Sequence, residues 1–89
     1  MTIIEQLTFL ASVYTQYAKE FTNNRHFATN KDNNIIIVKY EDTCKTTSVD
    51  TDYDYDQSYR HYSVYSNYDY IGAILIYDGY QVAFKPRSY

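Results

Sequence analysis

The stretch IIEQLTFLASVYTQYAKEF, residues 3–21, carries the clearest structural signal in the sequence. Its large apolar side chains recur at alternating spacings of four and three residues, which is the period of a helix with one buried face. Thr2 precedes Glu5 by three residues, the pattern of a capping box at a helix start. We therefore expect one helix from about residue 3 to Phe21 or Thr22. The apolar stripe consists of Ile3, Leu7, Leu10, Tyr14, Tyr17 and Phe21.

The apolar face of this helix fits two arrangements. It can cover a sheet, or it can pair with a second helix across a dimer axis. The stripe spans only about three heptads, near the lower limit for recognising a coiled coil, so the pattern leaves both open.

Strand and turn patterns follow the helix. Residues 22–34 are polar and rich in Asn, which predicts a loop. The β-branched run 35–38 predicts a buried strand that ends near Tyr40. Glu41 and Asp42 then mark its exit and a turn.

Two tyrosine-rich segments with a period of two come next. In residues 49–56 the aspartates share one parity and the apolar or aromatic residues share the other, so a strand would separate them onto opposite faces. A second strand is expected over residues 59–65, followed by a turn at Ser66 to Asp69.

Asp78-Gly79 is the strongest hairpin signal in the chain. It joins two expected strands, residues 73–77 and 80–84, and Pro86 ends the second of them. A two-residue turn would pair Tyr77 with Tyr80, Leu75 with Val82 and Ala73 with Phe84.

These elements predict a single domain, residues 1–89, of the α+β class. One long N-terminal helix would pack on a four- to five-stranded, mostly antiparallel sheet. The 89 residues include 13 Tyr and a single cysteine, Cys44, which excludes an intrachain disulfide. The chain has no apolar run of about 18 residues and no basic leader, so we expect a cytoplasmic protein without a membrane span. Dimerisation would be an ordinary way to stabilise so small a core.

No catalytic or metal site is predicted. Asp50, Asp52 and Asp54 have the spacing that opens an EF-hand loop, but Tyr55 stands where the sharp turn needs Gly, and His61 where a bidentate Glu belongs. Phosphate-binding and nucleophile motifs are missing from the sequence. We therefore expect no cofactor, no metal and no enzymatic activity.

The charge pattern argues against direct binding of nucleic acid. Residues 41–56 contain six acids and one base, a local balance of −5 in a chain of net charge −3. The tyrosines alternate with acids, whereas contacts to phosphates need cations.

The acidic row is the most informative feature for function. In a strand, alternate aspartates would stand about 6.6 Å apart on one face. One or two acids would suffice to protect a sheet edge, whereas a regular row presents a negative stripe to a partner. Such a stripe can occupy the cationic groove of a DNA-binding protein. The expected partner-binding residues are Glu41, Asp42, Asp50, Asp52, Asp54 and Asp56, and Tyr53, Tyr55, Tyr59 and Tyr62 would stiffen the strands or add contact area.

In size and in the acidic row of residues 41–56, the chain resembles small bacteriophage DNA-mimic proteins, in particular anti-restriction inhibitors of the Arn type. The resemblance implies a non-enzymatic and often dimeric inhibitor of a host restriction nuclease or other DNA-binding defence protein, acting in the host cytoplasm. The chain departs from the general pattern in its net charge of −3, which is modest for a DNA mimic.

Two alternatives remain open. The chain can be a protein-interaction module that inhibits a host enzyme through a tyrosine-rich surface. It can also bind nucleotides or nucleic acid through stacked tyrosines. In that case it would be retained on an oligonucleotide column, and added salt would release it.

Overall fold

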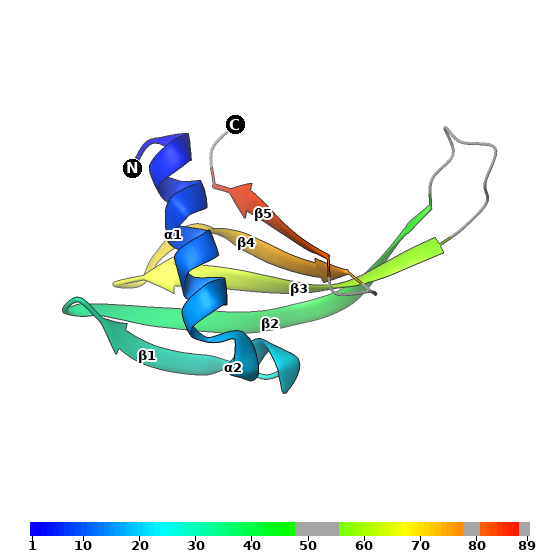
Figure 1. The fold of residues 1–89 in the computed structure, drawn as a ribbon, viewed down its shortest axis with the longest axis horizontal. Helices are drawn as coiled ribbons and strands as arrows, with labels where there is room; N and C mark the ends of the chain where they lie inside the picture. Colours follow the sequence, from blue (N-terminus) through cyan, green and yellow to red (C-terminus); the bar gives the residue numbers. More distant parts are fainter. Residues whose placement is uncertain (48–55, 78–80, 88–89) are drawn as a thin grey trace.

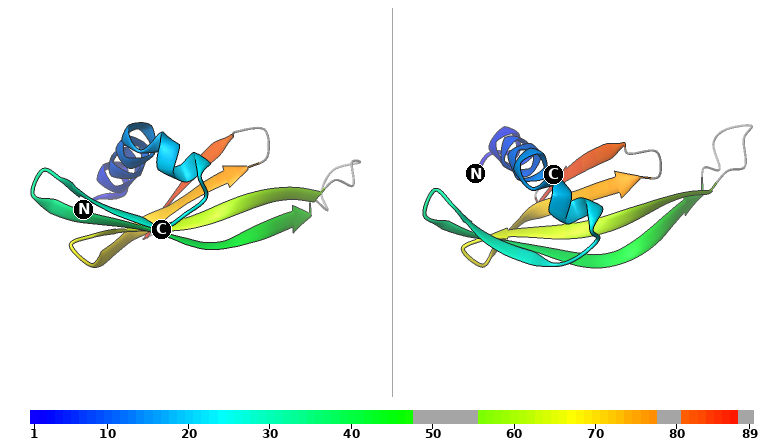
Figure 2. Two further views of the ribbon diagram at one scale, coloured as in Figure 1. Left: turned by 90° about the horizontal axis from the view of Figure 1, so that it is seen from below. Right: turned by 60° about the horizontal axis from the view of Figure 1, so that its bottom comes forward.

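The computed structural model describes residues 1–47, 56–77 and 81–87. Two helices are followed by five strands, which form one antiparallel sheet in chain order. Both helices lie on the same face of the sheet (Figures 1 and 2). The α+β class is therefore confirmed. The elements are α1 (Ile3–Gln16), α2 (Ala18–Thr22), β1 (Phe27–Lys31), β2 (Asn34–Thr47), β3 (Asp56–Ser66), β4 (Asp69–Tyr77) and β5 (Val82–Pro86).

The helical segment begins as predicted. The Thr2 hydroxyl accepts the Glu5 N–H (3.1 Å), and the Glu5 carboxylate accepts the Thr2 N–H (3.0 Å), completing the capping box. The prediction of one unbroken helix to Phe21 was wrong, because the backbone leaves helical geometry at Tyr17 (φ −120°, ψ 31°). After this break, α2 carries Phe21 against the rings of Phe27 and Tyr62.

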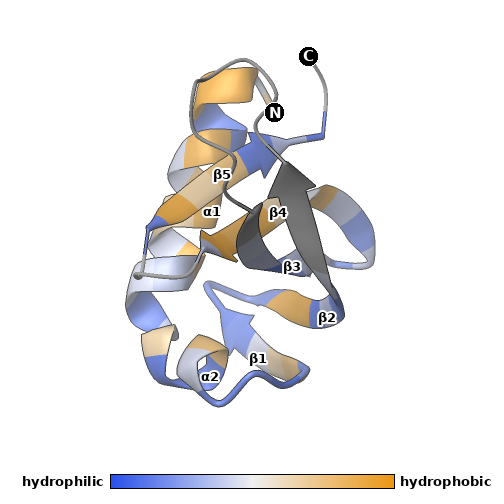
Figure 3. Cartoon of the chain, turned by 90° about the vertical axis from the view of Figure 1, so that its right-hand side faces the viewer, coloured by the Kyte–Doolittle hydropathy of each residue, from blue (hydrophilic) through white to orange (hydrophobic). Residues whose placement is uncertain are grey.

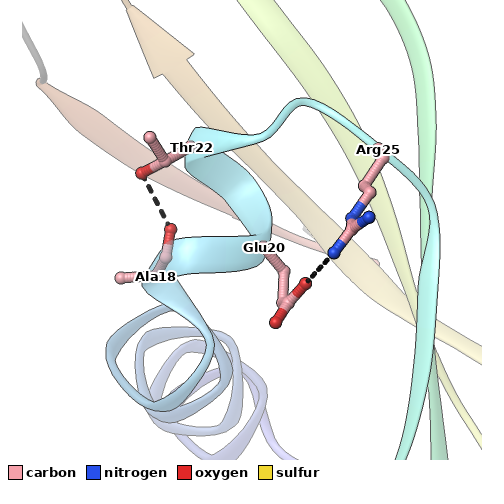
Figure 4. A network of polar contacts seen from close by, with 4 residues as sticks. All are labelled: Ala18, Glu20, Thr22 and Arg25. Carbon is pink, nitrogen blue, oxygen red and sulfur yellow. Dashed lines mark hydrogen bonds and ion pairs between the residues drawn. The ribbon is translucent and has the colours of Figure 1, made fainter.

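Local polar contacts hold α2 and the segment after it (Figure 4). The Thr22 hydroxyl donates to the Ala18 carbonyl (3.0 Å). Arg25 pairs with Glu20 at 3.3 Å, an exposed ion pair that adds little stability on its own.

The predicted loop over residues 22–34 was wrong in its second half, where β1 pairs with β2. The two strands are joined by Asp32 and Asn33, which have positive φ angles of 53° and 67°. Positive φ at both central residues is the signature of a type I′ hairpin turn, which Asn and Asp tolerate. The sequence Asp32-Asn33 is therefore the feature that could have predicted a hairpin here, and with it β1.

The predicted turn at Glu41 and Asp42 was also wrong, because β2 continues to Thr47. The strand register shifts between Tyr40 and Asp42, so that Glu41 is an extra residue opposite β3. This is a β-bulge, which bends the strand without ending it. The acidic pair therefore marks an irregularity inside a strand.

The predicted strand over residues 59–65 lies within β3, and the predicted turn after Ser66 is present. Asn67 and Tyr68 form that turn with φ angles of 51° and 71°. The predicted strand over 49–56 lies outside the described residues, except that Asp56 begins β3 opposite Thr47.

The last two strands pair as predicted, but the register was wrong by one residue. Ile76 lies opposite Val82 and Ile74 opposite Phe84. A shift of one residue exchanges the two faces of a strand. Ile74 and Ile76 therefore take the positions opposite Phe84 and Val82 that were predicted for Ala73 and Leu75, and both face the core. Asp78 and Gly79 lie outside the described residues.

The core lies between the helices and one face of the sheet, and Figure 3 shows hydrophobic segments of β4 and β5 beside α1. The buried face of α1 is turned from the predicted stripe. Ile3 is 45% exposed, whereas Gln6 and Val13 are buried. Gln6 is satisfied because its Oε1 accepts the Arg87 N–H (3.2 Å). The core residues are Leu10, Val13, Phe21, Ile36, Val38, Tyr62, Val64, Ile71, Ile74 and Ile76.

Within the described ranges, neither helix is long and apolar enough to cross a bilayer.

Candidate functional site

The face of the sheet opposite the helices carries a row of aromatic side chains, which we call the tyrosine face. Side chains alternate along a strand, and Tyr62 and Val64 of β3 point into the core. The residues between and beyond them therefore point to the other side, where no helix or strand of the described chain lies (Figure 2). On β3 these residues are Tyr59, His61, Ser63 and Tyr65, and their partners on β4 are Tyr77, Leu75, Ala73 and Tyr70.

Two tyrosine pairs stand at the ends of this face. The rings of Tyr59 and Tyr77 are 5.0 Å apart between centroids and inclined by 40°. Those of Tyr65 and Tyr70 are 5.6 Å apart and inclined by 62°. All four residues are half-buried. Cross-strand aromatic pairs of this kind stabilise a sheet and also offer apolar area to a partner.

The charges on this face are arranged in rows across the strands. Lys39 and Lys85 stand at the two ends of the row that contains Ser63. Asp42 lies opposite His61 in the neighbouring row, on the side of the Tyr59–Tyr77 pair. Basic charge therefore accompanies one tyrosine pair and acidic charge the other.

The second surface is the acidic arm, residues 41–56. The pairing of β3 with β4 ends at Tyr59 opposite Tyr77, while β2 and β3 pair on to Thr47 and Asp56 (Figure 1). The arm therefore begins inside the sheet, at Glu41 and Asp42, and only the pairs from Lys45 with Ser58 to Thr47 with Asp56 continue past β4 as a two-stranded ribbon. It holds a net charge of −5, from six of the eleven acids and one of the eight bases. The remaining five acids and seven bases give the rest of the chain +2.

The structure describes part of the predicted partner-binding set. Glu41 and Asp42 are exposed on β2, and Asp42 Oδ1 accepts the Thr43 N–H (2.7 Å). Asp56 is placed at the start of β3. The other predicted residues, Asp50, Asp52, Tyr53, Asp54 and Tyr55, lie outside the described residues, so the acidic stripe stays a prediction.

Tyr62 was expected to stiffen the strands or add contact area, and its complete burial excludes the second role. The face formed by Tyr65, Tyr70 and Tyr77 was not predicted from the sequence. The alternation of Tyr59, His61, Ser63 and Tyr65 was the available signal, but it could not tell which side the helix covers.

The described residues form no cluster of three or more His, Cys, Asp and Glu side chains able to hold a metal ion. A shallow groove of about 360 Å³ follows the outer side of α1. Its one carboxylate, Glu5, has a lowered pKa because the backbone and side chain of Thr2 hydrogen-bond to it. That carboxylate serves the helix cap. The groove is lined by Met1, Ile4, Glu5, Thr8, Phe9 and Ser12.

Comparison with known proteins found no matching family model, no similar curated protein and no similar solved structure.

Proposed function

We propose that this chain is a non-enzymatic inhibitor that mimics DNA, inserting its acidic arm into the cationic groove of a DNA-binding protein. One observation carries the proposal: residues 41–56 hold a net charge of −5 while the rest of the chain is +2, and the described ends of this segment, Thr47 and Asp56, pair with each other past the end of β4. The mechanism is competitive and needs no chemistry.

The physical basis is electrostatic complementarity. A groove that binds a duplex holds Lys and Arg side chains at the positions of the phosphates. Carboxylates on paired strands are held at fixed spacings, so they meet those cations without ordering a flexible chain. Opposite charge also accelerates the encounter, which gives the inhibitor an advantage at low ionic strength.

The resemblance to Arn-type anti-restriction inhibitors supports a class of partner: a host restriction nuclease or another DNA-binding defence protein of a bacteriophage host. Under this proposal the chain acts in the host cytoplasm. A homodimer would double the acidic surface, and the proposal includes it as a possible state.

A charge-reversal pair tests the arm. The partner is first identified by capture from a nuclease-treated bacterial lysate and then purified. Asp52→Lys with Asp54→Lys is expected to abolish binding and its salt dependence. The matched control, Asp32→Lys with Asp69→Lys, changes net charge equally on the body and is expected to retain both. Unchanged binding by the arm variant, or equal loss in the control, contradicts the proposal.

A second candidate function is supported by the tyrosine face. Aromatic side chains are enriched at protein interfaces, and this face carries two tyrosine pairs with no covering element among the described residues. The chain would then inhibit a host enzyme unrelated to DNA. Tyr65→Ala would weaken partner binding in that case, while Asp→Asn changes on the arm would not.

A further inference from the structure

The Tyr59–Tyr77 pair is the last pairing of β3 with β4, and β2 and β3 continue past it. The next row of the tyrosine face, two residues further along β3, pairs His61 with Asp42. Asp42 is therefore a diagonal cross-strand neighbour of Tyr59, a relation that places Cα atoms about 7–8 Å apart. Asp42 is exposed, and the two rings are half-buried. We call Asp42, Tyr59 and Tyr77 the arm base.

A guanidinium group suits this combination better than an ammonium group. Its planar cation stacks on an aromatic ring and presents several N–H donors in a plane that fits a carboxylate. An ammonium is a compact and strongly hydrated charge that gains less from the ring. The chain already contains one such contact, because the Arg60 guanidinium carbon lies 5.9 Å from the centre of the Tyr62 ring.

The other end of the tyrosine face lacks this complementarity. The Tyr65–Tyr70 pair is next to the row that contains the exposed Lys39, whose charge repels a cation. The arm base, in contrast, contains the exposed carboxylate of Asp42, and the exposed Glu41 precedes it on β2. Charge therefore selects the end of the face that a cationic side chain would use.

We propose that the arm base binds arginine side chains of the partner, so that the chain prefers an arginine-rich surface to a lysine-rich surface of equal charge. This inference rests on the proposed function, because it assumes that the acidic arm docks against cations. It adds a chemical preference that the arm charges alone would not give.

The test uses two labelled peptides of equal length and charge, a polyarginine and a polylysine, titrated by fluorescence anisotropy at low ionic strength. The wild-type chain is expected to bind the arginine peptide about fivefold more tightly. Tyr77→Leu keeps apolar bulk but removes the ring, and it is expected to remove this preference while leaving lysine-peptide binding unchanged. Tyr77→Phe keeps the ring and the preference.

Tyr65→Leu, at the opposite end of the same face, is the matched control and is expected to keep the preference. Equal binding of both peptides by the wild-type chain overturns the inference and leaves the proposed function standing. Binding of neither peptide contradicts the docking of the arm itself. Preference retained in Tyr77→Leu, or lost equally in Tyr65→Leu, also overturns the inference. Circular dichroism confirms that each variant is folded before titration.

Discussion

Gly72 is a point of very close contact between α1 and the sheet. Its φ is +159°, and a Cβ there would lie 2.4 Å from the Lys85 carbonyl oxygen and 2.9 Å from Leu10 Cδ1. The first of these atoms is backbone and cannot rotate away. Gly72→Ala is therefore expected to lower the free energy of unfolding by about 3 kcal/mol, through overpacking and backbone strain. Urea denaturation followed by circular dichroism measures the change.

Ala28→Ser is the control for this prediction, because Ala28 is exposed on β1 and its free energy of unfolding should change by less than about 0.5 kcal/mol. A Gly72→Ala variant as stable as the wild type would mean that neither β5 nor α1 approaches β4 this closely.

The Tyr62 hydroxyl connects β3 to the end of α2. It lies 3.1 Å from the Phe21 carbonyl oxygen and 2.9 Å from Asn24 Oδ1, and its single proton is shared between these two acceptors. Tyr62→Phe is expected to cost about 1–2 kcal/mol, because the buried bond is lost while the ring is kept. The Phe21 carbonyl retains Arg60 Nη1 at 3.0 Å, which limits the loss. Chemical denaturation measures the free energy of unfolding of this variant, with Tyr65→Phe as the control. An equal loss of stability in both variants would contradict the prediction.

Alkaline pH tests the same hydroxyl by a different route. Burial raises the pKa of Tyr62, and the Arg60 charge opposes part of that rise. In the unfolded chain tyrosine ionises near pH 10. Below that pH both states keep the proton, and above it the unfolded state releases its proton first, so the wild type loses stability as pH rises. Tyr62→Phe lacks this loss. Its stability deficit, measured by urea unfolding, should therefore shrink between pH 9 and pH 11, and a constant deficit would refute the assignment.

At the scale of elements, the β3–β4 turn contains an unusual residue. Tyr68 is 73% exposed and has a φ of 71°, a conformation that costs an aromatic residue about 1 kcal/mol. Tyr68→Gly is expected to raise the melting temperature, with a gain of about 0.5–1 kcal/mol, because glycine adopts positive φ freely. Asn67→Gly should gain less, since Asn already tolerates this region. A lower melting temperature for Tyr68→Gly would show that the ring contributes contacts that outweigh its strain.

The predictions were correct for elements with a local sequence pattern. They were wrong where a single extra residue changes the strand register. The helix start, the strand over 59–65 and the turn after Ser66 followed from local patterns. The bulge at Glu41 could not be predicted, because an extra residue leaves the apolar pattern of β2 almost unchanged. The β4–β5 register failed because Asp78-Gly79 suggested a two-residue turn, whereas the Tyr77 N–H donates to the Gln81 carbonyl and leaves three residues between them.

The candidate site was predictable in charge but not in arrangement. Counting acids identified residues 41–56, and the structure pairs Thr47 with Asp56 at the described ends of that segment. The position of Asp42 diagonally across from Tyr59 depends on the bulge and on the register of β2 with β3. Such long-range pairing leaves no mark in the local sequence.

At the scale of the whole molecule, the chain separates its stabilising core from its charge. The apolar side chains gather between the helices and the sheet, and six of the eleven acids fall in residues 41–56. Residues 41–47 belong to β2 and Asp56 to β3, so the body of the sheet holds these described parts of the arm in place. A net-negative surface can then be displayed without placing its self-repulsion inside the core.

That self-repulsion is itself measurable. Like charges on the arm oppose folding, and salt screens them over about 10 Å at 0.1 M. Glu41→Gln with Asp42→Asn keeps the acceptor at Asp42 Oδ1 and is expected to stabilise the chain by about 0.5 kcal/mol at low salt, with the gain fading as NaCl rises. Asp69→Asn, an acid removed from the net-positive body, is the control and should give no gain. Thermal unfolding across a salt series distinguishes them. An equal gain in both variants, or one that persists at high salt, would show that the arm charges do not repel one another as their grouping implies.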